Sequence, residues 1–208
     1  MARHPSLTAQ VPTPIRIYGR RVTLRPLITT DFPEWSEVRR RNEAWLTPWE
    51  PRRPPAVLDP SLNREAFSAR CAARDRDAAA GVAFGFGVFV DHRLSGEVNV
   101  NHDVRGAMQS GVIGYWVDEA RAGRGLIAES VVVVCAFAFE QLDLHRIEIC
   151  IVPRNRNSRR VMEKLAIREE GIALRFLEIN GVWEDHVRYG ITVEEWVQRR
   201  TEFAAQWL

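Results

Sequence analysis

The sequence has little cysteine, no long apolar run and almost no excess charge. Its three cysteines, Cys71, Cys135 and Cys150, are odd in number and form no CxxC motif. We interpret them as small core residues in a reduced cytoplasm, Cys150 included. The longest charge-free apolar run, Val131 to Phe139, is far shorter than a membrane-spanning helix requires. We therefore expect no membrane partner, and we expect no metal site.

Charge and length further limit the class of protein that this sequence can encode. The chain carries 29 basic and 27 acidic residues, a net charge of +2, which does not indicate direct nucleic-acid binding. The segment MARHPSLTAQ has no apolar signal-peptide core, so we expect a cytoplasmic location. The 208 residues, 46% of them hydrophobic, predict one folded domain over 15–208. Residues 1–14 are polar, contain three prolines and are expected to form a flexible arm.

The most informative stretch runs from 111 to 139. An apolar strand-type run, 112–117, is followed by a charged loop, by Gly123-Arg124-Gly125, and then by a strongly apolar helix. The first N–H groups of a helix lack intrahelical partners, and glycine lets a phosphate approach the backbone closely. Arg121 adds charge beside Arg124. The stretch therefore predicts an anion site for a phosphate-bearing ligand that also runs back along the strand.

Two common phosphate loops fit this stretch less well. A P-loop requires Gly-Lys-Ser/Thr at its end, and neither Lys nor Ser/Thr follows Gly125. The segment GRGLIA matches the dinucleotide fingerprint formally, with Ala128 in the last place. However, it lies past the middle of the chain, and no second mononucleotide half has room after it.

The remaining periodicity predicts strands interleaved with helices. The strand–helix–strand order between 112 and 152 implies a parallel crossover inside an otherwise antiparallel sheet. Asn180-Gly181 predicts a tight hairpin turn. The further strands are expected over 22–27, 82–90, 95–101, 145–152, 169–179 and 183–191.

Cap-type residues predict where the helices begin and end. Asp31 with Glu34 predicts the start of the first helix, Asp59-Pro60 starts a second that runs to about Arg76, and the segment 155–158 starts another. Ala166 resists a left-handed conformation, so this last helix is expected to end differently from the usual glycine-capped form. A short helix from Val193 closes the chain.

Four segments together resemble the GNAT N-acetyltransferases, and within them the RimJ/RimL group. The loop Ala120–Gly125 fills that family's pattern Q/R-x-x-G-x-G/A except at Ala120, where Arg121 stands beside the missing polar residue. The others are Trp45–Pro51, the N-x-x-S helix start at Asn155–Ser158, and the hairpin segment Gly181–Asp185. They stand in the family's order between about Arg21 and Trp196.

The resemblance implies an α/β (α+β) fold with a mixed, mostly antiparallel sheet of about seven strands flanked by helices. Two central strands should splay apart and bind acetyl-CoA, whose pantetheine arm pairs with the first of them. The co-substrate would be acetyl-CoA, with no metal. The residues expected to bind it are Trp116, Val117, Arg121, Ala122, Gly123, Arg124, Gly125, Leu126, Ile127, Ala128, Asn155 and Ser158.

The resemblance also implies direct attack of an amine on the thioester. Ser158 would protonate the departing thiolate, and a backbone N–H near Trp116 or Val117 would hold the oxyanion. Glu97, Glu148 and His102 remain open as the base. Asn155 and the rest of its segment could equally be simple helix caps, and the three base candidates could be ordinary surface residues.

The sequence does not identify the acceptor of the acetyl group. The N-terminal α-amine of a protein, of the ribosomal-protein alanine or serine type, is the first hypothesis. Alternatives are a small amine such as a polyamine, amino sugar or antibiotic, or a silent acyl-CoA-binding module. Either a monomer or a homodimer fits. The residues expected at the acceptor are Trp45, Trp49, Asn99 and Tyr115, although the two tryptophans could equally cover the edge of the core.

Overall fold

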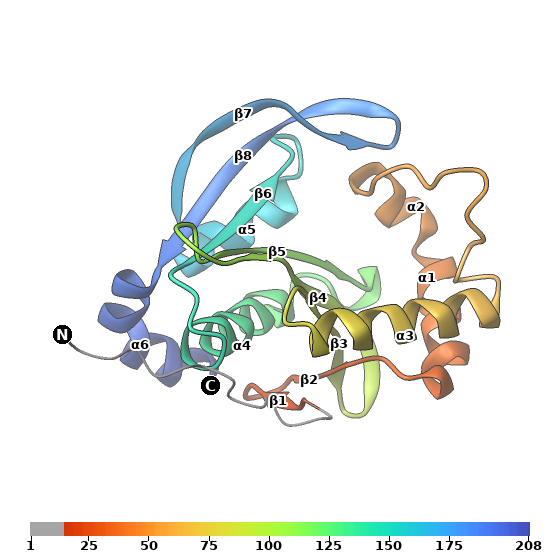
Figure 1. Ribbon diagram of the computed structural model, residues 1–208, viewed down its shortest axis with the longest axis horizontal. Helices are drawn as coiled ribbons and strands as arrows, with labels where there is room; N and C mark the ends of the chain where they lie inside the picture. Colours follow the sequence, from red (N-terminus) through yellow and green to blue (C-terminus); the bar gives the residue numbers. More distant parts are fainter. Residues whose placement is uncertain (1–14) are drawn as a thin grey trace.

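One twisted sheet organises the molecule (Figure 1). The computed structural model describes residues 15–208, apart from the side chains of residues 102–104, so the predicted arm lies outside it. The sheet has eight strands in the order β1-β2-β3-β4-β5-β6-β8-β7, and only the β5–β6 pair is parallel. The strands are β1 (Ile17–Tyr18), β2 (Thr23–Arg25), β3 (Phe84–Val90), β4 (Arg93–Val104), β5 (Ser110–Val117), β6 (Arg146–Ile151), β7 (Arg168–Ile179) and β8 (Val182–Thr192).

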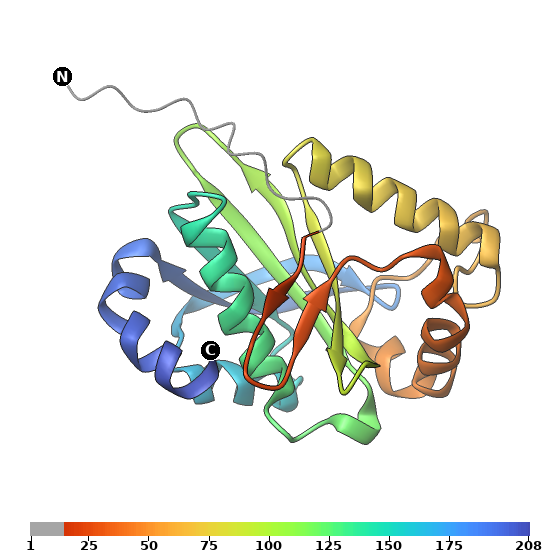
Figure 2. The same cartoon turned by 90° about the horizontal axis from the view of Figure 1, so that it is seen from below.

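Helices cover both faces of the sheet, as the turned view in Figure 2 shows. The longest apolar helix, α4, is buried almost all round, and its valines and phenylalanines fill the main core. A smaller core on the opposite face joins Trp35 of α1 to Phe67 of α3. The helices are α1 (Phe32–Arg41), α2 (Glu43–Leu46), α3 (Arg64–Ala79), α4 (Leu126–Glu140), α5 (Arg156–Leu165) and α6 (Val193–Trp207), with short 3-10 turns η1 (Thr29–Asp31), η2 (Thr47–Trp49) and η3 (Glu119–Arg121).

The two central strands diverge. Strands β5 and β6 pair only from Ser110↔Arg146 to Val112↔Glu148, although β5 continues to Val117 and β6 to Ile151. Figure 1 shows β6, β7 and β8 turning away from β3, β4 and β5 beyond this point. The predicted splay is therefore confirmed, and it leaves the outer half of β5 without a strand partner on that side.

One predicted helix start is wrong, and another is correct in position but lacks the expected side-chain cap. The helix expected from Asp59 begins at Arg64, where the Asn63 side chain accepts the N–H of Ala66 at 2.8 Å. The Asp59 carboxylate instead accepts from both the backbone and the hydroxyl of Ser61, which holds a turn before the helix. Asp31 is the N-cap residue of α1, as predicted, but its side chain caps no N–H of that helix, because the carboxylate accepts from Ile28 and Arg25 instead.

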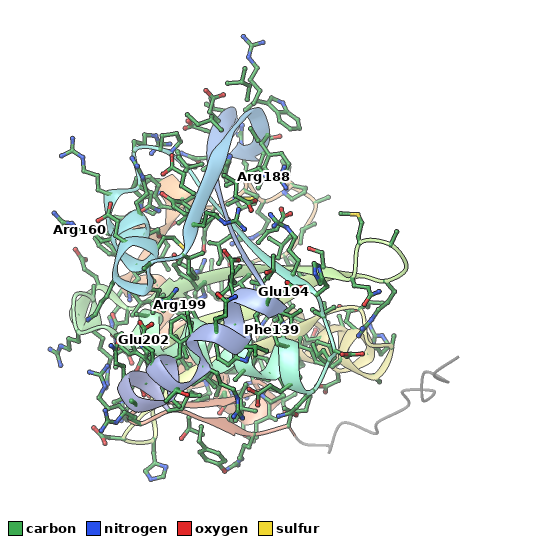
Figure 3. All side chains as sticks on the ribbon, turned by 90° about the vertical axis from the view of Figure 1, so that its left-hand side faces the viewer. Phe139, Arg160, Arg188, Glu194, Arg199 and Glu202 are labelled. Carbon is green, nitrogen blue, oxygen red and sulfur yellow. The ribbon has the colours of Figure 1, made fainter. Side chains whose placement is uncertain are left out.

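Two predictions near the C-terminus are also corrected. Ala166 does adopt the left-handed conformation, with φ of 46°, and its carbonyl accepts a hydrogen bond from Arg199 of α6. A tertiary contact therefore offsets the local preference. Helix α6 is not short, because its capping box at Thr192 and Glu195 opens a 15-residue helix. Arg199 and Glu202 lie one turn apart on it in Figure 3.

The predicted hairpin at Asn180-Gly181 is confirmed, since both residues have positive φ and join β7 to β8. Cys71 and Cys135 are buried, as expected, but Cys150 is only partly so. It alternates with buried Ile149 and Ile151 on β6 and therefore faces away from α4. Within residues 15–208, no helix combines the length and hydropathy that a membrane crossing needs.

Candidate active site

The glycine loop between β5 and α4 forms a backbone cradle. Gly123 and Gly125 have φ of 75° and 78°, in the left-handed region that favours glycine. A Cβ placed on Gly123 would meet no described atom within 4 Å, so the loop is open on that side. Gly125 is the N-cap of α4 and offers no side chain to the first-turn N–H groups. These amides are therefore available to an anion.

Basic side chains from distant segments converge on Gly125. A Cβ there would lie 3.2 Å from the Lys164 ammonium of α5 and 3.6 Å from the Arg21 guanidinium. The Trp207 ring of α6 lies 3.8 Å from the same Cβ position. The Lys164 ammonium lies over this ring, 5.0 Å from its centre. Among the described residues Lys164 makes no ion pair. The mouth of the loop is thus positively charged, as a diphosphate requires.

Buried carboxylates fix both ends of this loop. Glu129 of α4 is 1% exposed and accepts the N–H groups of Arg21 and Val22 at 2.5 and 3.0 Å, and it pairs with the Arg21 guanidinium at 2.8 Å. At the other end, Asp118 accepts from Asn42 at 2.8 Å and from Arg41 at 2.6 Å. Burial alone would raise the pKa of Asp118, but these hydrogen bonds outweigh it and keep the pKa below its ordinary value.

The outer half of β5 directs backbone groups into the opening. Asp118 donates its N–H to Ser95, so the antiparallel alternation puts Trp116 in a hydrogen-bonded pair with Glu97 of β4. The N–H and C=O groups of Tyr115 and Val117 consequently face β6. The Val117 carbonyl accepts from the Trp45 indole at 3.1 Å, on that side of the strand. These groups suit the amides of a pantetheine arm.

The start of α5 lies near the unpaired part of β5. Asn155 is its N-cap and accepts the Ser158 N–H at 3.1 Å. The side-chain oxygen of Asn155 therefore acts as a helix cap, which was the alternative interpretation of this residue. The Tyr115 hydroxyl donates to the Ser158 carbonyl over a long 3.4 Å. Burial raises the pKa of Tyr115 well above its usual range. The structure thus brings Tyr115 and Ser158 together, rather than Tyr115 and the expected acceptor residues.

Glu97 lies in a different environment from the opening. It is fully buried beneath α3, where its carboxylate accepts from Trp35 at 2.7 Å, Arg70 at 2.6 Å and Arg74 at 2.7 Å. Burial alone would raise the pKa of Glu97, but the two arginines lower it to about 2. Arg74 stays charged although its own burial lowers its pKa. A carboxylate so fully bonded has little capacity to accept a proton.

Glu148 lies at the apex of the opening. It belongs to the last β5–β6 pair and, like Cys150, points to the face opposite α4. Arg146 and Arg188 donate to it at 2.9 and 2.5 Å, and they keep its pKa below the ordinary value although burial works against this. Figure 3 labels Arg188 within the diverging part of the sheet. The side chain of His102 is not among those described.

The expected acceptor residues divide between two positions. Trp45 is bonded to the end of β5, and the Trp49 ring lies 4.8 Å from the Arg154 guanidinium that follows β6. Asn99 of β4 lies opposite Gly114 of β5 on the face away from α4. Its Oδ1 is buried without a hydrogen-bond partner among the described groups. An amine or amide N–H would satisfy this oxygen.

Sequence reasoning missed several of these contributors. Arg21 and Trp207 lie far from the loop in sequence, and no local pattern links either residue to it. Lys164 belongs to the same recognised helix segment as Ser158, so its positive charge could have suggested a role. Arg154 directly follows Pro153 at the end of β6, a place that the splay could have singled out.

Comparison with known proteins agrees with this geometry. The family model "Acetyltransferase (GNAT) domain" matches residues 21–168, which include the loop, both diverging strands and α5. The chain therefore belongs to the GNAT acetyltransferase family, whose members take an acetyl group from acetyl-CoA. Among the described side chains, which exclude those of residues 102–104, no cluster of three or more metal-ligating groups occurs.

Individual relatives indicate the RimJ/RimL type within the family. The chain is similar to the probable N-acetyltransferase YjcK of Bacillus subtilis, with 36% identity over 81% of this chain and 92% of that protein. It is also similar to the [Ribosomal protein uS5]-alanine N-acetyltransferase of Escherichia coli, with 28% identity over 89% of this chain and 95% of that one. Among solved structures, Mycobacterium smegmatis RimJ in complex with CoA-disulfide gives a TM-score of 0.80 at 28% identity, covering 90% and 96% of the two chains.

Proposed function

We propose that the protein transfers the acetyl group of acetyl-CoA to the N-terminal α-amine of a protein. The observation that carries this proposal is the combination of an uncapped, positively surrounded glycine loop with a strand whose outer backbone groups face an unpaired gap. The loop suits a diphosphate and the strand suits an amide-bearing arm. The named relative that acts on an alanine of ribosomal protein uS5 supports the choice of acceptor.

The chemistry follows from the groups around the opening. The neutral amine attacks the thioester carbonyl, the carbon–sulfur bond breaks, and CoA leaves as a thiolate. The Val117 N–H faces the gap and is proposed to hold the oxyanion. Ser158 is proposed to protonate the thiolate, and Asn99 is proposed to hold the amine through its unpartnered Oδ1.

Glu148 is proposed as the carboxylate that receives the amine proton, through water. Its pKa is low, so it is a weak base, but an N-terminal α-amine has a pKa of only about 8 and needs little assistance. Glu97 is not carried into the mechanism, because three donors already occupy its carboxylate. Holding both reactants in one cleft supplies much of the rate.

The experiment measures thiol release from acetyl-CoA with three kinds of acceptor. A peptide beginning with Ala or Ser is compared with the same peptide blocked at its α-amine, and with a panel of polyamines and amino sugars. Release with the free peptide alone supports the proposal. Release with a small amine alone supports the second candidate function, and CoA binding without any release would identify a silent binding module.

A further inference from the structure

Two segments meet across the open end of the diverging strands. Residues 47–52, carried by α2, lie on the β5 side, and the tip of the β7–β8 hairpin lies on the β6 side. They contact each other directly, because Asn180 donates its N–H to the Glu50 carbonyl at 2.8 Å. Arg52 lies against Gly181, 3.7 Å from where a Cβ of that glycine would be. Figure 1 shows this approach to the right of the opening.

Arg154 joins these segments from the end of β6. Its guanidinium forms an ion pair with Glu184 of β8, lies 4.8 Å from the centre of the Trp49 ring, and approaches the Pro48 carbonyl at 3.5 Å. One side chain thus contacts the α2–α3 connection and the hairpin at once. We name Trp49, Glu50, Arg154, Asn180 and Glu184 the acceptor ring.

The acceptor ring is anchored to both strands of the opening. Glu50 makes a two-fold ion pair with Arg39 at 2.6 and 2.7 Å, and Arg39 lies over the Trp116 ring of β5 at 5.1 Å. On the other side, every residue of β6 pairs with β8, from Arg146↔Thr192 to Ile151↔Val187. The ring therefore fixes the separation of the strand ends, between which the acetyl group would be presented.

A small cavity lies against the acceptor ring. It has a volume of about 330 Å³ and is lined by residues that include Pro153, Arg154, Trp183 and Glu184. This is at the low end of the roughly 300–1,000 Å³ of ligand pockets. Pro153 and Arg154 continue directly from the diverging end of β6, so the cavity adjoins the opening. An extended chain end can enter such a space.

From this arrangement we propose that Arg154 is a specificity-determining residue. By contacting both Trp49 and Glu184, it keeps the acceptor entrance narrow, so that the N-terminal end of a polypeptide is accepted and a bulky amine is rejected. The inference rests on the proposed function, since it concerns the acceptor side of the same site. Removing the guanidinium frees the Trp49 ring and the hairpin to move apart.

The test compares Arg154→Ala with Arg200→Ala, which removes an exposed arginine paired with Glu140 on the far side of α4. For Arg154→Ala, kcat/KM for an Ala-starting peptide falls by about tenfold, chiefly through KM. The KM for acetyl-CoA changes by less than about twofold, and a bulky amino sugar gains relative to the peptide by at least about tenfold. Arg200→Ala leaves all these values unchanged.

A second variant keeps the inference testable if Arg154→Ala does not fold. Glu184→Gln preserves the size of the side chain and removes only the charge of the ion pair, and it shifts the peptide-to-amine ratio in the same direction. An unchanged ratio in the folded variants, or an equal fall for both acceptors, overturns the role of Arg154. Failure of the wild-type protein to release thiol with any peptide overturns the proposed function instead, so the two failures are distinguishable.

Discussion

The two sides of the opening differ in the groups that line them: backbone on one side and charged side chains on the other. The side proposed to bind the nucleotide consists mainly of backbone: two left-handed glycines, uncapped amides and the unpaired half of β5. The opposite side consists of long side chains from α1, α3, β6 and β8, held in ion pairs. Backbone geometry depends little on pH, whereas charged networks depend on it strongly. Co-substrate binding and the acceptor side should therefore respond differently to the same perturbations.

The largest expected effect concerns Glu97, a charge that is buried beneath α3, outside the opening itself. Its folded-state pKa of about 2 lies below the ordinary value of 4.5, so its stabilisation is complete above pH 4.5 and is lost as the pH falls toward 2. The shift corresponds to roughly 3 kcal/mol. Urea unfolding of the wild type and Glu97→Gln should differ by this amount at pH 6, and the difference should vanish near pH 2.

A pH-independent difference between these two proteins would contradict the ionised state of Glu97. Co-substrate affinity supplies the contrast with the nucleotide side. Between pH 5 and 7, in samples that circular dichroism shows to be folded, Glu97→Gln should bind CoA as the wild type does, because no atom of Glu97 belongs to the loop.

The second effect concerns the backbone cradle. Gly125→Asp adds a carboxylate at φ of 78°, directly in the space between Lys164, Arg21 and Trp207. It neutralises the basic mouth and repels a diphosphate, so CoA affinity measured by calorimetry should fall by at least about 100-fold, or nearly 3 kcal/mol. Gly81→Asp is the matched control, since Gly81 has φ of 70° and open space around it. An unchanged affinity for Gly125→Asp would move the diphosphate site elsewhere.

The contrast also explains what the sequence could predict. The side proposed for the nucleotide is local in sequence, so a strand, two glycines and an apolar helix were enough to predict it, and the splay followed from the family resemblance. The acceptor side depends on contacts between residues far apart, such as Arg154 with Glu184 and Trp49. Nothing near Glu97 in the sequence shows that Arg70 and Arg74 will bury it.

The same distinction applies to the fold. Seven of the eight strands were predicted to within a few residues, because alternating apolar residues report directly on a buried sheet face, and the two-residue strand β1 was missed. Helix ends were predicted less well. Asp59 is a good cap type, yet its carboxylate is used by Ser61, and Asn63 caps the helix instead. At Ala166 a hydrogen bond from Arg199 stabilises a conformation that the residue itself disfavours.

A smaller effect is expected where the two sides meet. Tyr115 lies on β5, and its hydroxyl reaches the carbonyl of Ser158. Tyr115→Phe keeps the ring and removes only the hydroxyl, which we expect to support departure of the thiolate. Stopped-flow measurement of thiol release should show kcat lowered by about tenfold with the KM for acetyl-CoA unchanged. Ser158→Ala is the companion variant, and a greater effect of Tyr115→Phe would make the tyrosine the main proton donor.

The smallest expected effect tests whether the N-cap of α3, in addition to the ion pairs of Glu97, contributes to stability and to its acid dependence. Asn63 caps α3, the helix that carries Arg70 and Arg74 to Glu97. Asn63→Ala leaves the Ala66 N–H without its cap and should lower the free energy of unfolding by about 1 kcal/mol. Because the buried ion pairs lie more than one helical turn away, the acid dependence assigned to Glu97 should persist in this variant. A loss of that dependence would show that the cap, and not the charges alone, holds α3 over the sheet.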